Sequence, residues 1–530
     1  MEEHDYIIVG GGSAGCVIAN RLVSAGRSVL LLEAGPRDNN PFVHIPGTFV
    51  RVIGSRRTWM YQSEPEPGVL GRSMTVPQGR TLGGGSSVNA MIYIRGQRED
   101  YDTWRDMGCT GWGWEDVLPV FRRAENNQRL AGPLHGTQGP LHVSDNHEHR
   151  HPLSYAFVRA AQEAGIPFND DFNGAHQDGV GFFQTTTREG RRGSTAATYL
   201  KAVRGNRLLT IRTDAFIDGV VLENGAASGV SYRVKDGEKT QARARAEVIL
   251  CAGGIGTPKI LLLSGIGPAA QLAEHGIPVI RDMQGVGANY QDHITASVYG
   301  RTRDPVSLLG ADKGFKAVRH GLQYLLSRTG LLTSNVIESG GFIDTAGAGR
   351  PDIQIHVTPT LVGGFDRAPP DGHGITINPC ILRPTSRGTI RLRSRDPAAP
   401  ALMHSGALST AEDVATLVRG VRLARRILRA PSLAAVVERE LAPSEAEEVS
   451  DQALEEHVRR FAKTVFHPSG TCRMGTDEGA VVDPQLRVQG VPRLRVADAS
   501  VMPTLVSGNT NAPSVMIGER CADFILRHPA

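Results

Sequence analysis

The sequence contains few cysteines, little net charge and no long apolar run, and each shortage excludes a class of protein. The six cysteines are spread over 530 residues and form no C-x-x-C or C-x-x-x-x-C pattern, which argues against a disulfide frame, a zinc site and a flavin disulfide reductase. A formal net charge of +4 gives no case for nucleic-acid binding. No apolar stretch approaches the roughly 18 residues of a membrane-spanning helix, so we expect no transmembrane segment.

The beginning of the sequence also lacks a leader. Residues 1–5, MEEHD, are rich in acids and run directly into an apolar strand, which leaves no room for a signal peptide. Together with the scattered, reduced cysteines this predicts a cytoplasmic protein. A chain of 530 residues is longer than a single hydrophobic core usually supports, so two or more domains are expected.

A strand, a glycine-rich turn and a helix open the chain. Residues 6–9, YIIV, are apolar throughout and predict a buried parallel strand. Three glycines follow in G-x-G-x-x-G spacing: Gly10, Gly12 and Gly15. Such glycines permit a tight turn, let the backbone approach a pyrophosphate and let the helix pack closely on the strand. The first helix amides, at Ser13 and Ala14, would then face the phosphates, where the helix dipole favours negative charge.

An acid follows the second strand of this unit. Residues 28–32 predict that strand, and Glu33 lies 18 residues after Gly15, followed by Ala34. A carboxylate at this distance can accept hydrogen bonds from a ribose diol. Strands, glycines, helix and acid together predict a Rossmann-like dinucleotide-binding domain. The alternative interpretation is a glycine turn in an ordinary α/β domain.

A second glycine cluster lies at residues 79–91, GRTLGGGSSVNAM. Three consecutive glycines and two serines favour a loop in close contact with a ligand, and a serine there can cap a following helix. The backbone amides would suit a second phosphate or a ring carbonyl. The alternative interpretation is a flexible loop.

These residues resemble the first signature of the glucose-methanol-choline (GMC) oxidoreductases, a family that binds FAD. Further blocks resemble the family's other motifs in the same order: residues 252–268, 285–293, 467–475, 496–500 and 509–513. Because the blocks extend over almost the whole chain, the sequence is identified as a member of this family, on its alcohol and choline dehydrogenase side.

The resemblance implies an α/β fold in which a Rossmann-like FAD-binding domain is interleaved with an α+β substrate domain. The expected parts are the FAD-binding domain at 1–150, 194–310 and 465–530, and the substrate domain at 151–193 and 311–464. Strand signals followed by helix signals in the second domain predict an antiparallel sheet backed by helices. Residues 375–382 and 388–393 are expected to pair as strands, and residues 412–428 and 444–464 to form helices.

The resemblance also assigns the contacts with FAD. The expected residues are Gly10, Gly12, Ser13, Ala14, Gly15, Glu33, Ala34, Arg80, Gly84, Ser87, Val88, Asn89, Ala90, Met91, Ile217, Ala252, Gly253, Asp498, Ala499, Asn509, Asn511 and Pro513. Some family members attach FAD covalently through a histidine just before the signature asparagine. Here that position is Val88, and because valine cannot form the bond we expect FAD to be bound non-covalently. No metal is expected.

One histidine is singled out for the chemistry. A flavin accepts a hydride, so the protein must position an alcohol carbon beside it and remove the hydroxyl proton. His467 begins the H-P-x-G-T-C-R-M-G block, and histidine suits proton removal near neutral pH. In the family this histidine is paired with a second histidine or an asparagine, which predicts a His467/Asn511 pair here. The amide would hold the substrate oxygen but cannot act as a base.

The predicted activity is FAD-dependent oxidation of a primary alcohol to the aldehyde, with oxygen or a quinone-type carrier as the electron acceptor. The alternatives are a hydroxynitrile lyase with a redox-silent FAD, and a flavin-binding protein without catalysis. Glu338 either offers a carboxylate to a cationic substrate or is a solvated or salt-bridged surface acid. No concentration of aromatics predicts a cage for quaternary ammonium.

Overall fold

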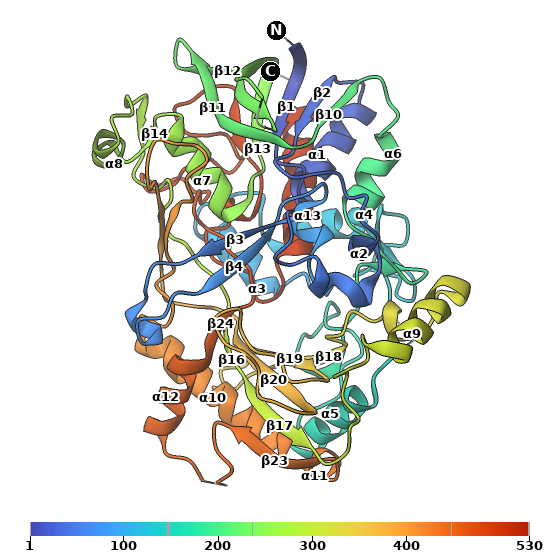
Figure 1. Cartoon of the computed structure of the whole chain (residues 1–530). Coiled ribbons are helices and arrows are strands. Elements are labelled where there is room, and N and C mark those ends of the chain that lie inside the picture. The colour runs from blue at the N-terminus through green and yellow to red at the C-terminus, as the bar shows by residue number, and fades with distance from the viewer. Residues whose placement is uncertain (1, 146–148, 236, 447, 528–530) are drawn as a thin grey trace.

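Two β-sheets organise the chain, one in the upper and one in the lower half of Figure 1. This computed structural model describes residues 2–145, 149–235, 237–446 and 448–527. In these ranges no helix is both long and apolar enough to cross a membrane.

The upper sheet has seven strands in the order β10-β2-β1-β13-β12-β11, with β25 also paired to β13. The strands are β1 (Glu2–Val9), β2 (Val29–Leu32), β10 (Leu209–Arg212), β11 (Ala215–Glu223), β12 (Ala226–Val234), β13 (Thr240–Leu250) and β25 (Leu494–Val496). All pairs are parallel except those of β12 with β11 and with β13. Helices α1 (Ser13–Ser24) and α13 (Asn511–Arg527) pack against each other beside it, so the two ends of the chain meet (Figure 1).

Local sequence explains the start of this sheet. Every residue of β2 is buried, as are residues 6–9 of β1, which is the pattern of a parallel strand covered on both faces. Gly10 has φ = +103°, and a Cβ there would lie 2.3 Å from the carbonyl oxygen of Cys251. Only glycine can therefore make the turn from β1 into α1.

The lower sheet is antiparallel and has eight strands in the order β23-β17-β20-β19-β18-β7, with β16 joining β20 to β24. The strands are β7 (Gly179–Phe182), β16 (Ile294–Ala296), β17 (Val298–Thr302), β18 (Ser339–Ile343), β19 (Ile353–Thr358), β20 (Gly374–Ile381), β23 (Val437–Ala442) and β24 (Ala462–Thr464). Helices α5 (Pro152–Glu163), α10 (Ala411–Leu428), α11 (Pro431–Ala434) and α12 (Asp451–Phe461) cover it. The predicted antiparallel sheet backed by helices is confirmed.

Shorter elements connect and surround the sheets. The remaining α-helices are α2 (Pro41–His44), α3 (Arg98–Asp106), α4 (Trp114–Ala124), α6 (Lys201–Val203), α7 (Gly253–Leu263), α8 (Ala269–Glu274) and α9 (Gly314–Ser327). The small two-stranded pairs are β3 (Thr58–Gln62) with β4 (Thr75–Gly79), β5 (Glu125–Asn127) with β6 (Leu141–Val143), β8 (Thr187–Arg188) with β9 (Arg191–Arg192), β14 (Ile266–Gly267) with β15 (Arg281–Asp282), and β21 (Thr389–Arg391) with β22 (Leu402–His404).

Three expectations about this region differ from the structure. The change of sheet comes before residue 310, since β16 and β17 already belong to the lower sheet. Residues 388–393 do not pair with 375–382, because β21 pairs with β22 instead. The helix expected at 444–464 is confined to α12, which begins after Ser450, whose Oγ accepts a hydrogen bond from the amide of Ala453 as an N-cap.

Candidate functional site

Two glycine-rich loops lie against each other at the start of α1. Gly12 is the N-cap of α1, and no side chain caps the helix there. A Cβ at Gly84 would lie 2.7 Å from the Cα of Gly12, and the amide of Gly83 donates to the carbonyl of Gly11 at 2.6 Å. The amides of Ser13 and Ala14 are among the first of the helix, which have no intrahelical acceptor. This end of the helix therefore has the geometry of an anion site.

Gly15 has the packing role that its spacing predicts. A Cβ at this position would lie 2.0 Å from the carbonyl oxygen of Gly10 and 3.3 Å from Ile8. The helix can therefore approach the strand this closely only because residue 15 is glycine. On the other side of α1, a Cβ at Gly518 would lie 2.8 Å from the carbonyl oxygen of Ala14, so α13 is equally close.

Glu33 lies at the carboxyl end of β2, next to Ala34. Its two carboxylate oxygens accept hydrogen bonds from the amides of Gly11 (2.9 Å) and Gly35 (2.8 Å). Desolvation raises the pKa of Glu33 to about 7, although both amides and the guanidinium of Arg80 act to lower it. Each oxygen keeps a lone pair that can accept a hydroxyl donor, so the acid fits a ribose diol.

The start of α7 provides a second set of polar groups. Asp498 Oδ2 accepts hydrogen bonds from the amide of Gly253 at 2.8 Å and from Thr257 Oγ1 at 2.6 Å, while Oδ1 accepts from the amide of Ser500. Burial raises the pKa of Asp498 despite these donors. Ala252 is the N-cap of α7, and Ala499 begins the short 3-10 helix Ala499–Val501. The chain thus brings residues 252–253 and 498–499 together, and both segments are among the predicted FAD contacts.

Open space beside two of the glycines tests whether a cofactor fits. At Gly85 and Gly253, no atom of the described residues other than the adjoining backbone and chain neighbours lies within 4 Å of where a Cβ would be. Backbone amides, the carboxylate of Glu33 and that of Asp498 all belong to this region. A donor-rich backbone with acids for hydroxyl groups fits the phosphates, ribose and ribityl chain of FAD.

The second glycine loop positions the remaining predicted contacts. Ser87 Oγ donates to the carbonyl of Leu82 at 2.7 Å, and Val88 is buried at the C-cap of the 3-10 helix Gly84–Ser87. Asn89 Oδ1 accepts from the amide of Met91 at 3.1 Å. The Ala90 carbonyl accepts a hydrogen bond from the side chain of Asn335, and the Arg80 guanidinium lies 4.2 Å from the Trp59 ring centre. Of the remaining predicted contacts, Ile217 is buried in β11 and Pro513 is in the first turn of α13.

Arg192 is a residue of this loop region that the sequence analysis missed. Its Nη1 donates to the Ser86 carbonyl at 3.1 Å and to Asn89 Oδ1 at 2.8 Å, and its Nε donates to the Val43 carbonyl at 2.7 Å. Burial lowers the pKa of Arg192 to about 9. The guanidinium therefore fixes the orientation of the signature asparagine. No local pattern around Arg192 indicates this, since its partners lie 103 to 149 residues away in the chain.

His467 is presented at the end of β24 by a strained turn. Phe466 before it has φ = +72°, a conformation that bulky residues rarely adopt. The amide of His467 donates to Asp292 Oδ1 at 2.8 Å, and Thr464 Oγ1 donates to Asp292 Oδ2. Burial raises the pKa of Asp292 to about 6. The turn is thus held in place by a buried carboxyl group from the 285–293 block.

A chain of hydrogen bonds fixes the tautomer of His467. His293 Nε2 lies 3.0 Å from the carbonyl oxygen of Leu382, which can only accept, so Nε2 carries the hydrogen. Burial lowers the pKa of His293 to about 4, although the carbonyls of Leu382 and Val506 act to raise it, and the ring is neutral at pH 7. Its Nδ1 must then accept from His467 Nδ1, 2.8 Å away. The lone pair of His467 then lies on Nε2 and can accept a hydrogen bond.

The amide beside this lone pair belongs to Asn509 and not to Asn511. Asn509 Nδ2 lies 3.4 Å from His467 Nε2, and Asn509 Oδ1 accepts from Gln354 Nε2 at 3.1 Å. The expected partner, Asn511, begins α13 and accepts from Ser13 Oγ at 2.8 Å. The pairing expected from the sequence is therefore corrected to His467/Asn509, because the amide two residues earlier in the N-T-N segment is the one that contacts the histidine.

Glu338 is neither a solvated nor a salt-bridged surface acid, because its carboxylate is buried and holds the start of α5. It accepts from the amide of His151 at 2.6 Å, from Ser154 Oγ at 2.8 Å and from Ser334 Oγ at 2.6 Å. A carboxylate at a helix N-terminus is stabilised by the helix dipole. Three protein donors already satisfy the group, so Glu338 is unsuited to receiving a cationic substrate.

Replacing Glu338 by alanine is expected to destabilise the protein without changing substrate affinity. Three buried donors would lose their acceptor, which costs about 2–4 kcal/mol in the free energy of unfolding. Urea unfolding of the FAD-loaded protein measures this, with E438A at an exposed position of β23 as the matched control. A variant with wild-type stability and a raised KM would instead place the carboxylate in the substrate site.

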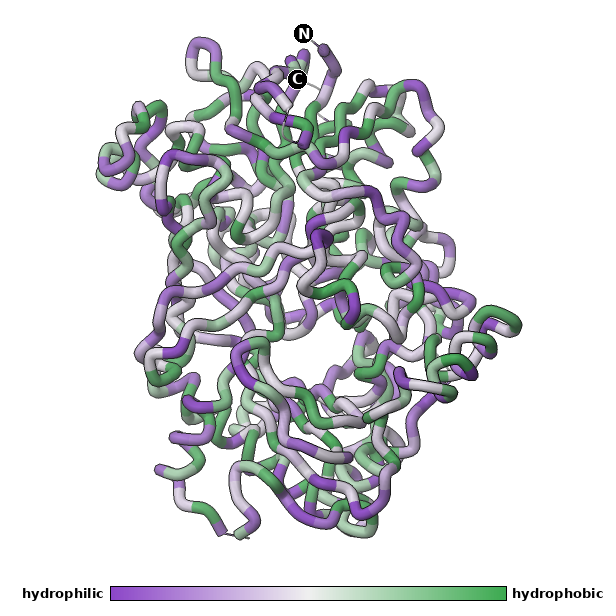
Figure 2. Tube along the Cα trace, in the orientation of Figure 1, coloured by the Kyte–Doolittle hydropathy of each residue, from purple (hydrophilic) through white to green (hydrophobic). Residues whose placement is uncertain are grey.

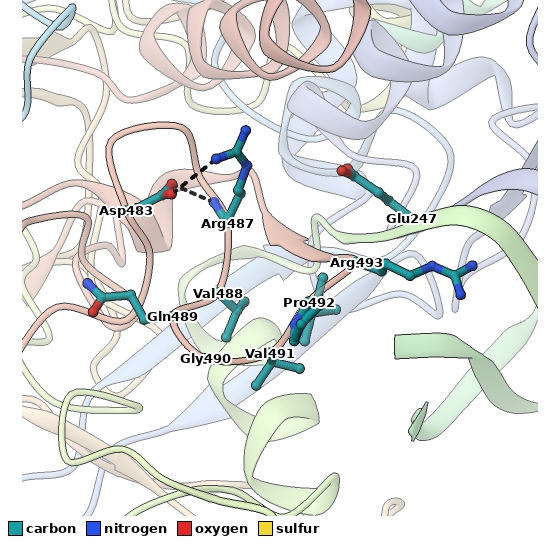
Figure 3. Close-up of a pocket in the computed structure, with 10 residues that line it drawn as sticks. Glu247, Asp483, Arg487, Val488, Gln489, Gly490, Val491, Pro492 and Arg493 are labelled. Carbon is teal, nitrogen blue, oxygen red and sulfur yellow. Dashed lines mark hydrogen bonds and ion pairs between the residues drawn. The ribbon is translucent and has the colours of Figure 1, made fainter. Parts of the chain in front are cut away.

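A surface hollow of about 360 Å³ lies elsewhere, around the loop before β25 (Figure 3). Glu247, Asp483, Arg487 and residues 488–494 line it, and Arg487 turns back to Asp483 in the close-up. It borders the amino end of β25 and Glu247 of β13, whereas Gly253 and Asp498 follow the carboxyl ends of these two strands. Ligands of open parallel sheets bind at the carboxyl ends, so this hollow is separate from the candidate site.

Comparisons with known proteins agree with this arrangement. Models described as GMC oxidoreductase match residues 4–295 and 384–518. The chain is 44% identical over 535 residues to an alcohol dehydrogenase (acceptor) of Pseudomonas putida, covering 99% of this chain and 96% of that protein. It is 41% identical over 541 residues to mitochondrial choline dehydrogenase of Mus musculus, covering 100% and 90%. The crystal structure of pyridoxine 4-oxidase from Mesorbium loti superposes with a TM-score of 0.91 at 31% identity, covering 99% and 100%.

The family matches include the glycine-rich opening, the 79–91 loop and the His467 block. They account for the paired glycine loops at α1 and for the FAD-binding domain that carries them. The chain therefore belongs to the GMC oxidoreductase family and is an FAD-dependent oxidoreductase that acts on CH–OH groups.

Proposed function

We propose that this protein oxidises a primary alcohol to the aldehyde, with His467 as the base that removes the hydroxyl proton. The observation that supports it most is the chain of hydrogen bonds from the Leu382 carbonyl through His293 to His467 Nδ1, from which we infer that His467 Nε2 carries an acceptor lone pair. Bound FAD supplies the acceptor for the hydride that leaves the alcohol carbon. The residues of the chain have the tasks of binding, orienting and deprotonating the substrate.

Asn509 is the partner we propose for the substrate oxygen. Gln354 donates to its Oδ1, which turns the Nδ2 donor toward His467. A hydroxyl oxygen between the two side chains would accept from Asn509 Nδ2 and donate its proton to His467 Nε2. The 3.4 Å contact between them in the free site is long for a hydrogen bond, so the substrate has little to displace.

The surroundings of Asn509 favour an apolar alcohol over a cationic one. Gly508 lies against Ile94 and Phe342, members of a buried apolar cluster. The cluster consists of Ile92, Ile94, Phe172, Phe183, Phe342 and Leu382. His356 lies beside Phe183, with ring centres 5.9 Å apart, and burial lowers the pKa of this histidine to about 3. With Glu338 already bonded, we infer an uncharged alcohol with an apolar chain.

An anaerobic titration tests the reaction class. Under nitrogen, an alkanol that is a substrate bleaches the flavin absorbance, whereas choline is expected to bleach it more slowly or not at all. If no alcohol bleaches the flavin, the protein is instead a hydroxynitrile lyase with a redox-silent FAD, the second candidate. Admitting oxygen or a soluble quinone to the reduced protein identifies which acceptor reoxidises it.

FAD is expected to be bound non-covalently. Val88 occupies the position before the signature asparagine, and a valine side chain has no nucleophile. Denaturing the purified protein and filtering it should leave all the yellow colour in the filtrate. Flavin that stays with the polypeptide on a denaturing gel would contradict this prediction.

The pH dependence of kcat/KM is expected to be flat from pH 8 down to 6.5. His467 must be neutral to accept a proton, and desolvation, with smaller effects of His293 and His356, lowers its pKa well below 6.5. Protonation, and hence loss of activity, therefore begins only at more acidic pH, where the rate falls tenfold per pH unit. An acid limb at or above pH 7 would show that His467 titrates as an ordinary imidazole or that another group controls the rate.

A further inference from the structure

Helix α9 (Gly314–Ser327) exposes its apolar side chains instead of burying them. It projects from the right side of the molecule in Figure 1, and Figure 2 shows hydrophobic segments along it. Five large side chains are exposed: Phe315 (82%), Val318 (56%), Leu322 (54%), Leu325 (69%) and Leu326 (85%). Spacings of three, four, three and one residues place them on one stripe about 100° wide.

The opposite face of the helix holds it to the protein. Tyr324 is the buried residue of α9, and its hydroxyl donates to the carbonyl of Gly190 at 2.9 Å. Ala317, His320 and Gly321, which lie on the same face, are half-buried. The exposed stripe is therefore not the face by which α9 packs on the protein, because the face that carries Tyr324 already does this.

The charges around the stripe are mostly positive. Within α9 the charged residues are Lys316 and Arg319, and no acid is present. Residues 311–328 contain four cations and one acid, a net charge of 4 − 1 = +3. The acid, Asp312, is paired with Arg51 at 3.3 Å. On a helical projection Arg319 borders the apolar stripe and Lys316 lies one step beyond it.

We propose that α9 is an interfacial helix that docks the protein on a membrane leaflet rich in anionic lipids. The apolar stripe would lie at the boundary between headgroups and acyl chains, with Arg319 and Lys316 among the phosphates. Fourteen residues of helix extend about 21 Å, short of the roughly 30 Å hydrocarbon core, so the helix lies in the plane of the surface.

Charge complementarity favours this occupant over a second copy of the chain. A two-fold dimer through α9 would oppose the same basic residues of two copies, at a cost in repulsion. An anionic lipid surface attracts them. Its fluid headgroups also accept a single protruding helix without a complementary groove.

Co-sedimentation of the FAD-loaded protein with vesicles tests the proposal. Vesicles of phosphatidylcholine containing about a third phosphatidylglycerol should bind the protein at least ~10-fold more tightly than phosphatidylcholine alone, and high salt should reverse this. The double variant L322E/L325E should lose ~10-fold or more in affinity, and R319Q about fivefold. V279E, at an exposed position (45%) in the segment between α8 and β15, is the matched control and should bind like the wild type; α8 lies on the opposite side of the molecule from α9 in Figure 1.

Several results would overturn the proposal. They are equal binding to both vesicle types, no binding to either, or wild-type binding by L322E/L325E. A concentration-dependent dimer that L325E dissociates, without vesicle binding, would assign the stripe to a second copy. Turnover of a water-soluble alcohol should be the same in all these variants, which separates a lost docking helix from a damaged fold.

Discussion

Replacing His467 by alanine is expected to lower kcat by ~10²–10⁴-fold, the usual contribution of a general base. The proposed substrate hydroxyl would lose the Nε2 lone pair that receives its proton, and Asn509, the other side chain proposed to contact it, is an amide and cannot act as a base. FAD content should stay at the wild-type level, because the glycine loops, Glu33 and Asp498 that fit the cofactor do not depend on the imidazole. Turnover per bound flavin, measured under saturating alcohol, gives the result directly.

The matched control for this variant is H404A, at an exposed histidine of β22. It should keep wild-type turnover, flavin content and thermal midpoint. If H467A retained more than about a tenth of the activity per flavin, the proton would have to leave by another route, and the proposed mechanism would be wrong.

The FAD half of the molecule was predictable because its constraints are local. Gly15 is fixed by the 2.0 Å contact that a Cβ would make with the carbonyl oxygen of Gly10, within one strand-turn-helix unit. The 2.3 Å contact at Gly10 is made with Cys251, but the G-x-G-x-x-G spacing already marks that turn. Glu33 follows β2 by one residue, so its position at the sheet edge comes with the strand. Spacing and sterics within about 30 residues of chain therefore specify the first strand-turn-helix unit and its acid.

The partner of His467 was not predictable from the same kind of evidence. Asn509 and Asn511 are two residues apart, and one precedes α13 while the other begins it. Which amide faces the histidine depends on how the helix starts, and that is set by contacts with Ser13 and Gln354. Both partners lie more than 150 residues away in the chain, so no spacing within the motif carries the information.

The role of His293 and the pairing of β21 with β22 were not predictable from the sequence for a related reason. The sequence motif containing His293 was recognised, but its role appears only when the Leu382 carbonyl and His467 are placed around it. Likewise, alternation identifies residues 389–391 as a strand but does not name β22 as its partner. Periodicity reports which face of an element is buried, and the identity of the neighbour is a tertiary property.

Replacing His293 by leucine is expected to lower kcat/KM by ~10–10²-fold, although the proposed mechanism gives this residue no contact with the substrate. The ring acts through His467: it accepts from Nδ1 and so keeps the proton off Nε2. Leucine accepts nothing, so His467 could adopt the tautomer with Nε2 protonated, which is useless as a base. The loss should be smaller than in H467A, because a neutral hydrogen bond sets a preference and the base itself remains.

The asparagine variant separates positioning from packing. H293N keeps an oxygen where Nδ1 was, so His467 retains an acceptor, and most of the activity lost in H293L should return. Both variants should also raise the pKa of the acid limb, because His293 is one of the groups that lower the pKa of His467. A merely structural role would reduce flavin content and thermal midpoint without moving that limb. Equal losses in H293L and H293N, at wild-type flavin content, would refute the tautomer argument.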